Sequence, residues 1–500
     1  MTAAMALALA AGAAMGQITG PSSSQTPFLL PTSGGTSPAP GAVRTVSIFT
    51  TGDSIGGYRM AGIPDGLGAF SNGDGTMSLL MNHEIGGTAG SVRSHGSTGA
   101  FVSRWNINAD VNNLTVNSGR DHLTSSAGLN LWNGTSYASG TTQFTRFCSG
   151  DLAPQSAYSF GGLGTTNRIF MNGEESGAEG RAFAHVATGA DANTTWQLPK
   201  LGRFSWENSV ASPKAQAKTI VMGNDDSTPG QVYMYVGNKT DSGNDIQRAG
   251  LTNGNLYGIA VQGLTTETRT AGVSGRFVTA NLGDVSSLSG AELQVASTNA
   301  GVTEFLRPED GAWDARPGFE NDFYFVTTDR VNTTSQVGAS RLYRLRFDDI
   351  SNPEAGGSVT MLLDGRTSGF QMLDNLCVDK FGRILMQEDV GNNAHLGKMW
   401  LYDTASQGLA LIAQHDPARF LSGSADFQTV DEESSGVMDA SDLLGDGWYL
   451  LDVQNHKSLG GELVESGQLL AMYVDPSVIP APSSMGLLGL AALVAGRRRR

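Results

Sequence analysis

The chain has 500 residues, which is too long for one ordinary hydrophobic core unless the fold is a large barrel or propeller. Hydrophobic residues make up 39% and charged residues only 16%, and the 66 glycines follow no collagen period, so many tight turns between short strands are expected. The formal net charge of −15 argues against a nucleic-acid binder, because such proteins usually carry a basic surface. The two cysteines, Cys148 and Cys377, are too few for a disulfide framework and leave either one bridge or two buried free thiols.

The first residues of the chain are typical of a targeting segment rather than of a fold. Residues 1–16 are almost wholly Ala, Leu, Met and Gly, as in the apolar region of a signal peptide, and the small residues before Gln17 suit a cleavage site. No positive charge precedes this stretch, and a buried helix is the alternative interpretation. Residues 17–43, rich in Ser, Thr, Pro and Gly, are predicted to be an extended lead-in.

From residue 44 to residue 475 the chain keeps one uniform composition, which predicts a single domain. Short β-rich runs such as Thr76–Met81, Arg168–Met171 and Trp448–Val453 recur between Gly, Asn and Asp turn signals. Many short strands in one large domain predict an all-β fold, namely a single large β-propeller with irregular insertions. No strict period of about 40–50 residues is visible, which argues against WD40 or kelch repeats.

Acidic residues gather in short clusters at the ends of these runs. Carboxylates that lie together raise one another's pKa unless a cation neutralises them, and calcium takes about six to eight oxygen ligands. In a propeller the loops of successive blades meet near a central channel, so clusters far apart in sequence can form one polynuclear site. We expect this of the clusters at 82–84 and 172–175, which directly follow apolar strands, whereas Glu388-Asp389 and Asp431-Glu432-Glu433 are predicted to be solvated turns.

Seven short motifs follow one another along this body. They are Pro64-Asp65-Gly66, Leu80-Met81-Asn82-His83-Glu84, Asn172-Gly173-Glu174-Glu175, Leu201-Gly202-Arg203-Phe204-Ser205-Trp206-Glu207, Gly223-Asn224-Asp225-Asp226, Arg307-Pro308-Glu309-Asp310 and Asp374-Asn375-Leu376. In this order they resemble the PhoX-type alkaline phosphatases over about residues 48–456. The resemblance implies a six-bladed β-propeller that hydrolyses phosphate esters at an iron pair combined with calcium ions.

The resemblance also implies roles for individual residues. Arg307 would hold the substrate phosphate and, with Glu174, would be catalytic. Asn82 and Asn375 would lie beside the metal ligands. The implied ligands themselves are Glu84, Glu174, Glu175, Glu207, Asp226, Glu309 and Asp374. Clustered cations and one Arg fork suit phosphoryl transfer, which mainly requires charge neutralisation and alignment.

One departure from the family pattern concerns the soft ligand. The phosphatases have Cys-Glu-Glu, with a thiolate that bridges the irons, where this chain has Gly173-Glu174-Glu175. Cys148 lies upstream and would reach the site only if its loop folds back. Because carboxylates suit hard ions and thiolate is the soft ligand, calcium is expected more firmly than iron.

Other catalytic patterns give little support for a different chemistry. The sequence contains no His-Glu-x-x-His, no Gly-x-Ser-x-Gly and no Walker loop. His83 and His456 lie beside motif residues and are expected in the ligand shell or at the substrate, whereas the other five histidines are expected to be structural.

The C-terminus has the layout of a sorting signal. Pro480-Ala481-Pro482 is followed by the apolar stretch Met485–Gly496, too short for a membrane span of about 20 residues, and by four arginines. This tail resembles the PEP-CTERM signal that exosortases process in Gram-negative bacteria. It implies export to the cell envelope, the outer surface or the medium, transient membrane contact, and removal of residues 478–500.

The sequence thus favours a secreted, metal-dependent phosphoric ester hydrolase that acts on a small phosphate ester. Two alternatives stay open. One is a non-catalytic calcium-binding propeller at the cell surface, and the other is a phytase-like or lactonase-like propeller that acts on another ester. Gly173 favours these alternatives, and the carboxylates with Arg307 favour the phosphatase.

Overall fold

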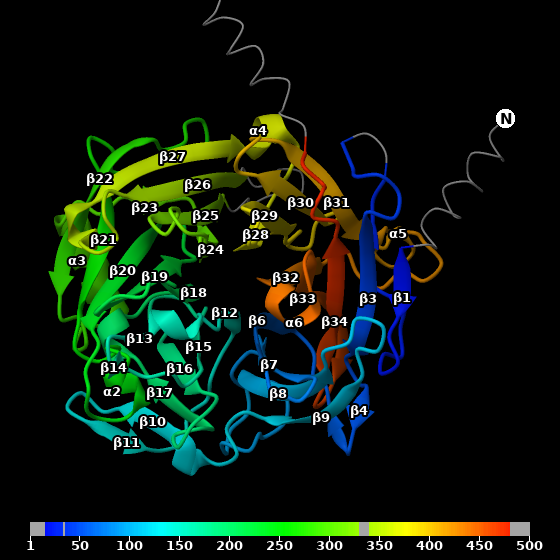
Figure 1. Ribbon diagram of the computed structural model, residues 1–500, viewed down its shortest axis with the longest axis horizontal. Coiled ribbons are helices and arrows are strands. Elements are labelled where there is room, and N and C mark those ends of the chain that lie inside the picture. The colour runs from blue at the N-terminus through cyan, green and yellow to red at the C-terminus, as the bar shows by residue number, and fades with distance from the viewer. Residues whose placement is uncertain (1–15, 34–35, 330–339, 481–500) are drawn as a thin grey trace, which may run out of the picture.

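The computed structural model describes residues 16–33, 36–329 and 340–480, and in this part the chain is mostly β-strand, as expected (Figure 1). The sheets stand around a central axis and follow one another in chain order, from blue to red in the figure. Hydrophobic clusters fill the spaces between neighbouring sheets. The predicted signal segment and most of the predicted sorting tail lie outside the described residues.

The first two sheets are built on antiparallel meanders, and the second has two strands added at its outer edge. The first has the order β6 (Pro64–Ser71), β7 (Thr76–His83), β8 (Phe101–Asn108) and β9 (Val116–Asp121). The second has the order β12 (Phe147–Asp151), β15 (Ile169–Glu174), β16 (Ala182–Val186), β17 (Thr194–Gln197), β10 (Leu129–Trp132) and β11 (Tyr137–Ser139). The added strands β10 and β11 join it through a parallel pairing of β10 with β17. The turn 72–75 joins β6 to β7, and Gly73 and Gly75 adopt there the positive φ values of 81° and 87° that glycine permits.

A large sheet comes next and consists of two meanders joined at their outer strands. Its order is β18 (Trp206–Ala211), β19 (Lys218–Asp225), β20 (Gly230–Asn238), β21 (Asn255–Val261), β22 (Gly275–Gly283), β27 (Gly357–Asp364), β26 (Ser340–Phe347), β25 (Asp322–Thr328) and β24 (Pro308–Trp313). The short β23 (Glu304–Phe305) pairs with β20. The pairing of β22 with β27 joins the two meanders, and this leaves β18 and β24 at the two edges of the sheet.

The last two sheets combine the two ends of the chain. One has the order β28 (Leu373–Val378), β29 (Arg383–Glu388), β30 (Lys398–Asp403), β31 (Leu409–His415) and β2 (Leu29–Pro31). The other has the order β32 (Glu432–Asp439), β33 (Trp448–Gly460), β34 (Val464–Val474), β3 (Val43–Thr50) and β1 (Gln17–Thr19). The segment expected to be a lead-in therefore pairs with the body at two places, and β3 pairs with β34.

Small elements complete the described structure. Two hairpins are formed by β4 (Ser54–Ile55) with β5 (Tyr58–Arg59) and by β13 (Ser159–Phe160) with β14 (Leu163–Gly164). The helices are α2 (Asp245–Arg248), α3 (Gly290–Asn299), α4 (Gly365–Ser368), α5 (Pro417–Phe420) and α6 (Ser441–Leu444). No helix among the described residues is long and apolar enough to cross a membrane.

The innermost strands of the sheets form a closed ring around the axis. In chain order β6 contacts β12, β12 contacts β18, β18 contacts β24, β24 contacts β28, β28 contacts β32, and β32 contacts β6 again. Four of these strands directly follow a non-glycine residue of positive φ: Ile63 (50°), Arg146 (45°), Arg307 (51°) and Met372 (47°). The same backbone kink thus leads the chain into the ring four times.

Candidate metal centre

The pairing of each inner strand is irregular, and this irregularity directs side chains toward the axis of the ring. An extra residue in an antiparallel ladder bends the strand and re-aims its side chains. Register shifts interrupt β6 at 65–67, β12 at 147–150, β18 at 206–208, β24 at 308–311, β28 at 373–376 and β32 at 435–438. Glu207 and Glu309 lie on these bulges, and their carboxylates approach each other from adjacent inner strands.

The first group of possible metal ligands combines two carboxylates with a thiol. Asp65 on β6, Glu84 directly after β7 and Cys148 on β12 each place one ligand atom within 4.8 Å of the others, and all three are buried. Gln454 on β33 holds the two carboxylates, because its Nε2 donates to Asp65 Oδ2 and to Glu84 Oε2, both at 2.9 Å. The thiol that the sequence left doubtful therefore lies at the centre.

Two further groups continue from the first. Cys148, Glu175 and Glu207 form the second, and Glu207, Asp226 and Glu309 form the third, by the same limit of 4.8 Å between ligand atoms. Cys148 is common to the first and second groups, and Glu207 to the second and third. The three groups are therefore one chain of shared ligands across β6, β12, β18 and β24.

The pKa values of these buried side chains are raised, which indicates that nearby positive charge would stabilise their ionised forms. Burial, followed by the charge of neighbouring carboxylates, raises the pKa of Asp65 and Glu207 well above the usual range. Burial, with Asp65 and Glu207 nearby, also raises the pKa of the Cys148 thiol. Cations at this place would reverse these shifts, because a bound metal ion deprotonates its ligands.

Glu309 provides a specific test of whether the residues suit a metal ion. Its side chain is 0% exposed, and within the described residues neither carboxylate oxygen accepts a hydrogen bond. The Arg307 Nη2 atom lies 3.0 Å from Glu309 Oε1 as an ion pair, which leaves Oε2 without a partner in this part of the chain. A buried carboxylate oxygen is rarely left unpaired, so the third group suits a hard cation.

Two arginines lie among the carboxylates. Arg307 donates from Nε and Nη2 to the two oxygens of Asp226, at 2.5 and 3.0 Å, and its side chain is 14% exposed. Arg146, which the sequence analysis missed, pairs with Glu84 at 2.6 Å and with Glu175, and its side chain is 48% exposed. Arg146 is thus the more accessible of the two guanidinium groups.

Glu174 does not join the centre. In a strand, neighbouring side chains point to opposite faces. The Glu175 side chain therefore points toward the axis, and the Glu174 side chain points away from it. Both Glu174 oxygens are held by Arg181, with Nε and Nη2 at 2.6 Å in a bidentate pair. The structure therefore places Glu174 away from the metal and catalytic roles that the sequence suggested, in a contact between β15 and β16.

Asp374 and Asn375 lie near the centre but outside the three groups. Asn375 donates from Nδ2 to Asp374 Oδ1 at 2.5 Å and accepts from the Gly436 N–H at 2.6 Å. Burial, with Asp389 next in importance, raises the pKa of Asp374. The charges of other carboxylates therefore act on the pKa of Asp374.

Asn82 supports the strand that carries the thiol. Its Nδ2 donates to the Cys148 carbonyl at 2.5 Å, and its Oδ1 accepts from Asn172 at 2.8 Å. Asn172 Oδ1 in turn is 2.9 Å from His185 Nε2, and His185 Nδ1 is 2.8 Å from the Thr195 hydroxyl. A buried chain of hydrogen bonds therefore links β7, β12, β15, β16 and β17.

The two histidines singled out by sequence lie in different surroundings. His83 is fully buried, bonds Gly62 O and Ser103 Oγ, and stacks on Phe101, so it is structural rather than part of the site. His456 bonds Glu465 Oε2 at 2.6 Å. Burial alone lowers its pKa, but the bond to Glu465 and nearby carboxylates raise it to about 9.

The acidic turns predicted to be solvated are in fact buried. Glu388, Glu432 and Glu433 are 0%, 1% and 7% exposed. Glu433 lies close enough to Asp389 for that charge to add to burial in raising its pKa. The prediction of solvated turns was wrong for these three glutamates, because neighbouring segments cover them: His395 and Trp400 contact Glu388, and the Gly397 N–H donates to Glu432.

Asp65, Cys148, Arg146 and Gln454 are the residues that sequence reasoning did not assign. Asp65 belongs to a quoted motif, so its position was a usable signal. Cys148 is 25 residues before Gly173, and only the pairing of β12 with β15 brings it to the centre.

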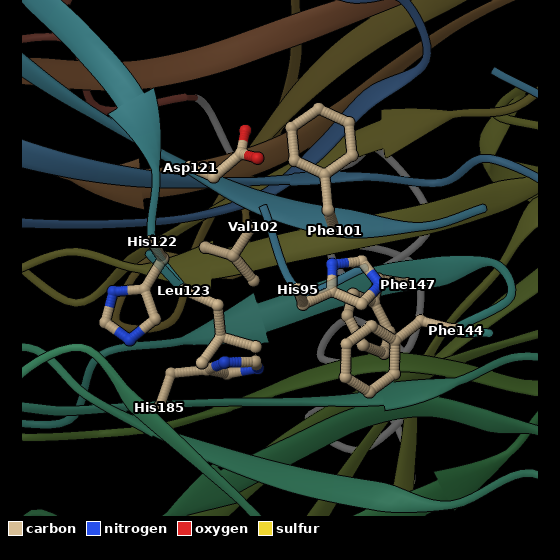
Figure 2. A pocket seen from close by; sticks show the side chains of 9 residues that line it. All are labelled: His95, Phe101, Val102, Asp121, His122, Leu123, Phe144, Phe147 and His185. Carbon is tan, nitrogen blue, oxygen red and sulfur yellow. The ribbon is translucent and has the colours of Figure 1, made fainter. Parts of the chain in front are cut away.

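Three other histidines line a small cavity between the first and second sheets (Figure 2). His95, His122 and His185 line it together with Phe144 and Phe147. His122 Nδ1 and His95 Nε2 are buried and lack a hydrogen-bond partner among the described residues, whereas both nitrogens of His185 are bonded. Their ligand atoms form none of the metal groups found among the described residues.

Comparison with known proteins found one similar family and several similar solved structures. The family model described as alkaline phosphatase PhoX matches residues 186–433. Among solved structures, Pseudomonas fluorescens PhoX in complex with vanadate, a transition state analogue, is similar with a TM-score of 0.64 and 13% identity, covering 88% of this chain and 97% of that one. A GH43 beta-xylosidase/alpha-arabinofuranosidase from a compost metagenome gives a TM-score of 0.34 at 8% identity, covering 82% and 90%. No curated protein sequence matches.

These comparisons have different weights. The PhoX structure shows that the chain shares its fold, and the low score of the glycosidase carries no argument. The family match covers the segment from β16 to β32, which contains Glu207, Asp226, Arg307 and Glu309. The family resemblance inferred from sequence motifs is thus supported over this segment.

Proposed function

We propose that the protein is a metal-dependent phosphatase that hydrolyses phosphate monoesters at the axis of the ring. The observation that carries the proposal is the chain of shared ligands from Asp65 to Glu309 through Cys148 and Glu207. The PhoX family match and the fold shared with a vanadate-bound PhoX support the same activity.

The fold that presents this site is a β-propeller of six blades. The closed ring of six inner strands supports this assignment, as does the repeated kink before β6, β12, β24 and β28. The large sheet then counts as two blades that are joined through β22 and β27.

The ligand types divide the cations between the groups. The third group offers only carboxylates, which suit calcium, whereas Cys148 adds a soft ligand to the first and second groups and suits a transition metal such as iron. Bound cations would supply positive charge to the phosphate and to the departing oxygen.

The two arginines bind the phosphate and hold the carboxylates in place. Arg146, being the more exposed, receives the incoming phosphate with its guanidinium fork, and Arg307 fixes Asp226 and Glu309. In the reaction, water oxygen forms a bond to phosphorus as the bond from phosphorus to the ester oxygen breaks. One water proton ends on the alcohol and the other stays with the phosphate, so the products are an alcohol and hydrogen phosphate.

The test is hydrolysis of p-nitrophenyl phosphate by the full chain loaded with calcium and iron. Glu309→Gln keeps the shape of the side chain but removes its charge, and should lower kcat by on the order of 100-fold or more. Glu320→Gln, at a loop remote from the three groups, is the matched control and should leave kcat unchanged. Vanadate should inhibit the wild-type protein.

Two results would contradict the phosphatase assignment. One is a protein that binds calcium but hydrolyses no phosphate ester with any metal, which would make it a surface calcium-binding propeller. The other is hydrolysis confined to lactones or carboxylic esters.

We further propose, from the targeting segments expected in the sequence, that this activity lies outside the cytoplasm. In the proposed route, residues 1–16 are removed on export, the mature chain consists of the lead-in 17–43 and the domain 44–475, and an exosortase-type enzyme removes residues 478–500 at the envelope of a Gram-negative bacterium. The intact mass of the exported protein tests this, because a product that retains the four terminal arginines would contradict it.

A further inference from the structure

A cavity of about 350 Å³ lies beside the proposed phosphatase site. It is bounded by the residues before β18, by the turn between β19 and β20, and by the first turns of α3. Arg203, Phe204, Ser227, Ala291 and Gln294 are among the residues that line it. None of these was assigned a role above.

The cavity adjoins the third ligand group through the backbone. Asp225 and Ser227 both line it, and Asp226, a member of that group, stands between them. The Asp226 N–H donates to Ser205 O at 2.8 Å, and the Arg307 N–H donates to Ser227 O at 3.2 Å. The cavity and the third ligand group thus lie on the two sides of the segment 225–227, and a group attached to a phosphate at the centre would enter the cavity by passing Asp226.

The charges that line the cavity are already paired. Arg203 Nη1 is 3.0 Å from Glu179 Oε2, and Glu179 Oε1 accepts from the Gly290 N–H at 2.9 Å, so this carboxylate ties the start of α3 to the segment before β18. Asp225 Oδ1 accepts from Ser205 N and from the Ser227 hydroxyl. The cavity consequently suits a neutral polar occupant rather than a second phosphate.

The remaining lining suits hydroxyl groups on a compact ring. Gln294 has a carboxamide whose Nε2 makes a 3.5 Å contact with the Thr298 hydroxyl within the described part of the chain. Phe204 is buried between Trp206 and Tyr233, with ring centroids 3.9 and 4.7 Å away, so it forms a fixed wall of the cavity. A few polar groups among apolar side chains are the usual composition of a small-molecule site of this size.

We infer that this cavity binds the alcohol part of the phosphate ester, and that this part is a neutral, hydroxyl-rich group of about the size of a sugar. The inference rests on the proposed function, because it makes the cavity the place where the leaving group is recognised. Gln294 and Arg203 would bond the hydroxyl groups, and the exposed lining residues Pro229 and Ala291 would contact the apolar face of the ring.

The test compares two esters on metal-loaded protein, glucose 6-phosphate and methyl phosphate, whose alcohol is too small to fill the cavity. Ala291→Trp, at an exposed position of α3, should raise KM for glucose 6-phosphate about tenfold and change methyl phosphate less than twofold. Gln294→Leu should raise KM for glucose 6-phosphate several-fold more than KM for methyl phosphate. Ala300→Trp, exposed at the far end of the same helix, is the control and should change neither ester.

A binding measurement separates this inference from the phosphatase assignment. Methyl glucoside, which carries no phosphate, should bind the wild-type protein in saturation-transfer NMR, and Ala291→Trp should abolish the signal. If the wild type hydrolyses no ester but binds methyl glucoside in this way, the cavity is supported and the phosphatase assignment fails. Hydrolysis of both esters with a selectivity that neither variant alters, or no binding of methyl glucoside, would overturn the inference.

Discussion

Cys148 contributes one sulfur atom to two ligand groups, so the affinity of the centre for soft metals depends on this side chain. Carboxylates supply all of the remaining ligands in the three groups. Hard cations can therefore bind without the thiol, whereas a transition metal loses its preferred ligand when the thiol is removed.

Replacement of Cys148 by Ser should accordingly separate the two kinds of metal. We expect the calcium content to stay within about twofold and the iron or cobalt content to fall about tenfold or more, since a hydroxyl is a poor ligand for these ions. Metal analysis measures both, and loss of the sulfur-to-cobalt absorption band would identify the ligand directly. Cys377→Ser alters the other buried thiol, which packs in a hydrophobic cluster, and should change neither metal.

Gly173 illustrates a steric limit that the sequence does not reveal. A Cβ at this position would lie 2.3 Å from Trp206 Cβ and 2.6 Å from Trp206 Cγ, and Trp206 is 1% exposed. Gly173→Cys should therefore lower the stability by about 1–3 kcal/mol, as overpacking does, and add no metal. A thermal melt with metal analysis checks this, and a stable variant with a raised iron content would contradict the steric account.

At the scale of elements, bulges and kinks are responsible for the geometry of the site. The kink at Ile63, Arg146, Arg307 or Met372 turns the chain into an inner strand, and the bulge a few residues later aims side chains across the axis. Strained backbone of this kind persists only where the surrounding structure holds it, and it gathers at functional sites. Hydrogen bonds between neighbouring sheets provide that support.

Asn82 is the strongest example of this support, because it joins β7 to the carbonyl of Cys148 on β12. Asn82→Ala removes the side-chain donor to that carbonyl and the acceptor of Asn172 Nδ2, and should lower stability by about 1–3 kcal/mol. It should also weaken metal binding, because β12 is no longer fixed. Chemical denaturation and a cobalt titration measure the two effects. Asn72→Ala, in the exposed turn before β7, is the control, and equal effects of the two variants would contradict the role of Asn82.

For the whole molecule, the concentration of carboxylates on one axis makes stability dependent on cations. A ligand that binds only the folded state at 100 times its dissociation constant adds about 2.7 kcal/mol. Chelation should therefore lower the melting temperature clearly, and added calcium should restore it. An unchanged melting curve in excess chelator would show that the three groups hold no metal.

The metal-free protein should also lose stability as the pH rises from about 6.5 to 8. Burial raises the pKa of Asp151 to about 7, and that of Asp452 to about 8, above the value of about 3.9 in the unfolded chain. The folded state then holds more protons than the unfolded state, and this stabilisation disappears as the pH rises through these folded values. His83 and His122, with pKa lowered to about 3 by burial, act in the opposite direction only below about pH 6.5. Denaturation in chelator at several pH values measures the slope, and a rise in stability over this range would contradict it.

Sequence patterns could predict the strands, their turns and most of the acidic ligands, because alternation and glycine turns are local features. Glu207 and Glu309 were found from motifs, and the structure brings them together. Glu174 and Cys148 were misjudged for the same physical reason. Bulges decide which of two neighbouring side chains faces the axis. Sheet pairing decides whether a distant strand supplies a ligand. Neither can be read from a short stretch of sequence.

The pairing of β3 with β34 has a consequence for when the protein acquires its metal. The first long strand of the body finds its partner only after the last one has been synthesised, so the ring cannot close on a growing chain. Asp65 and Gln454, which hydrogen-bond across this closure, meet only at that final step. An ion bound at the centre would therefore be selected by the compartment in which the finished chain folds.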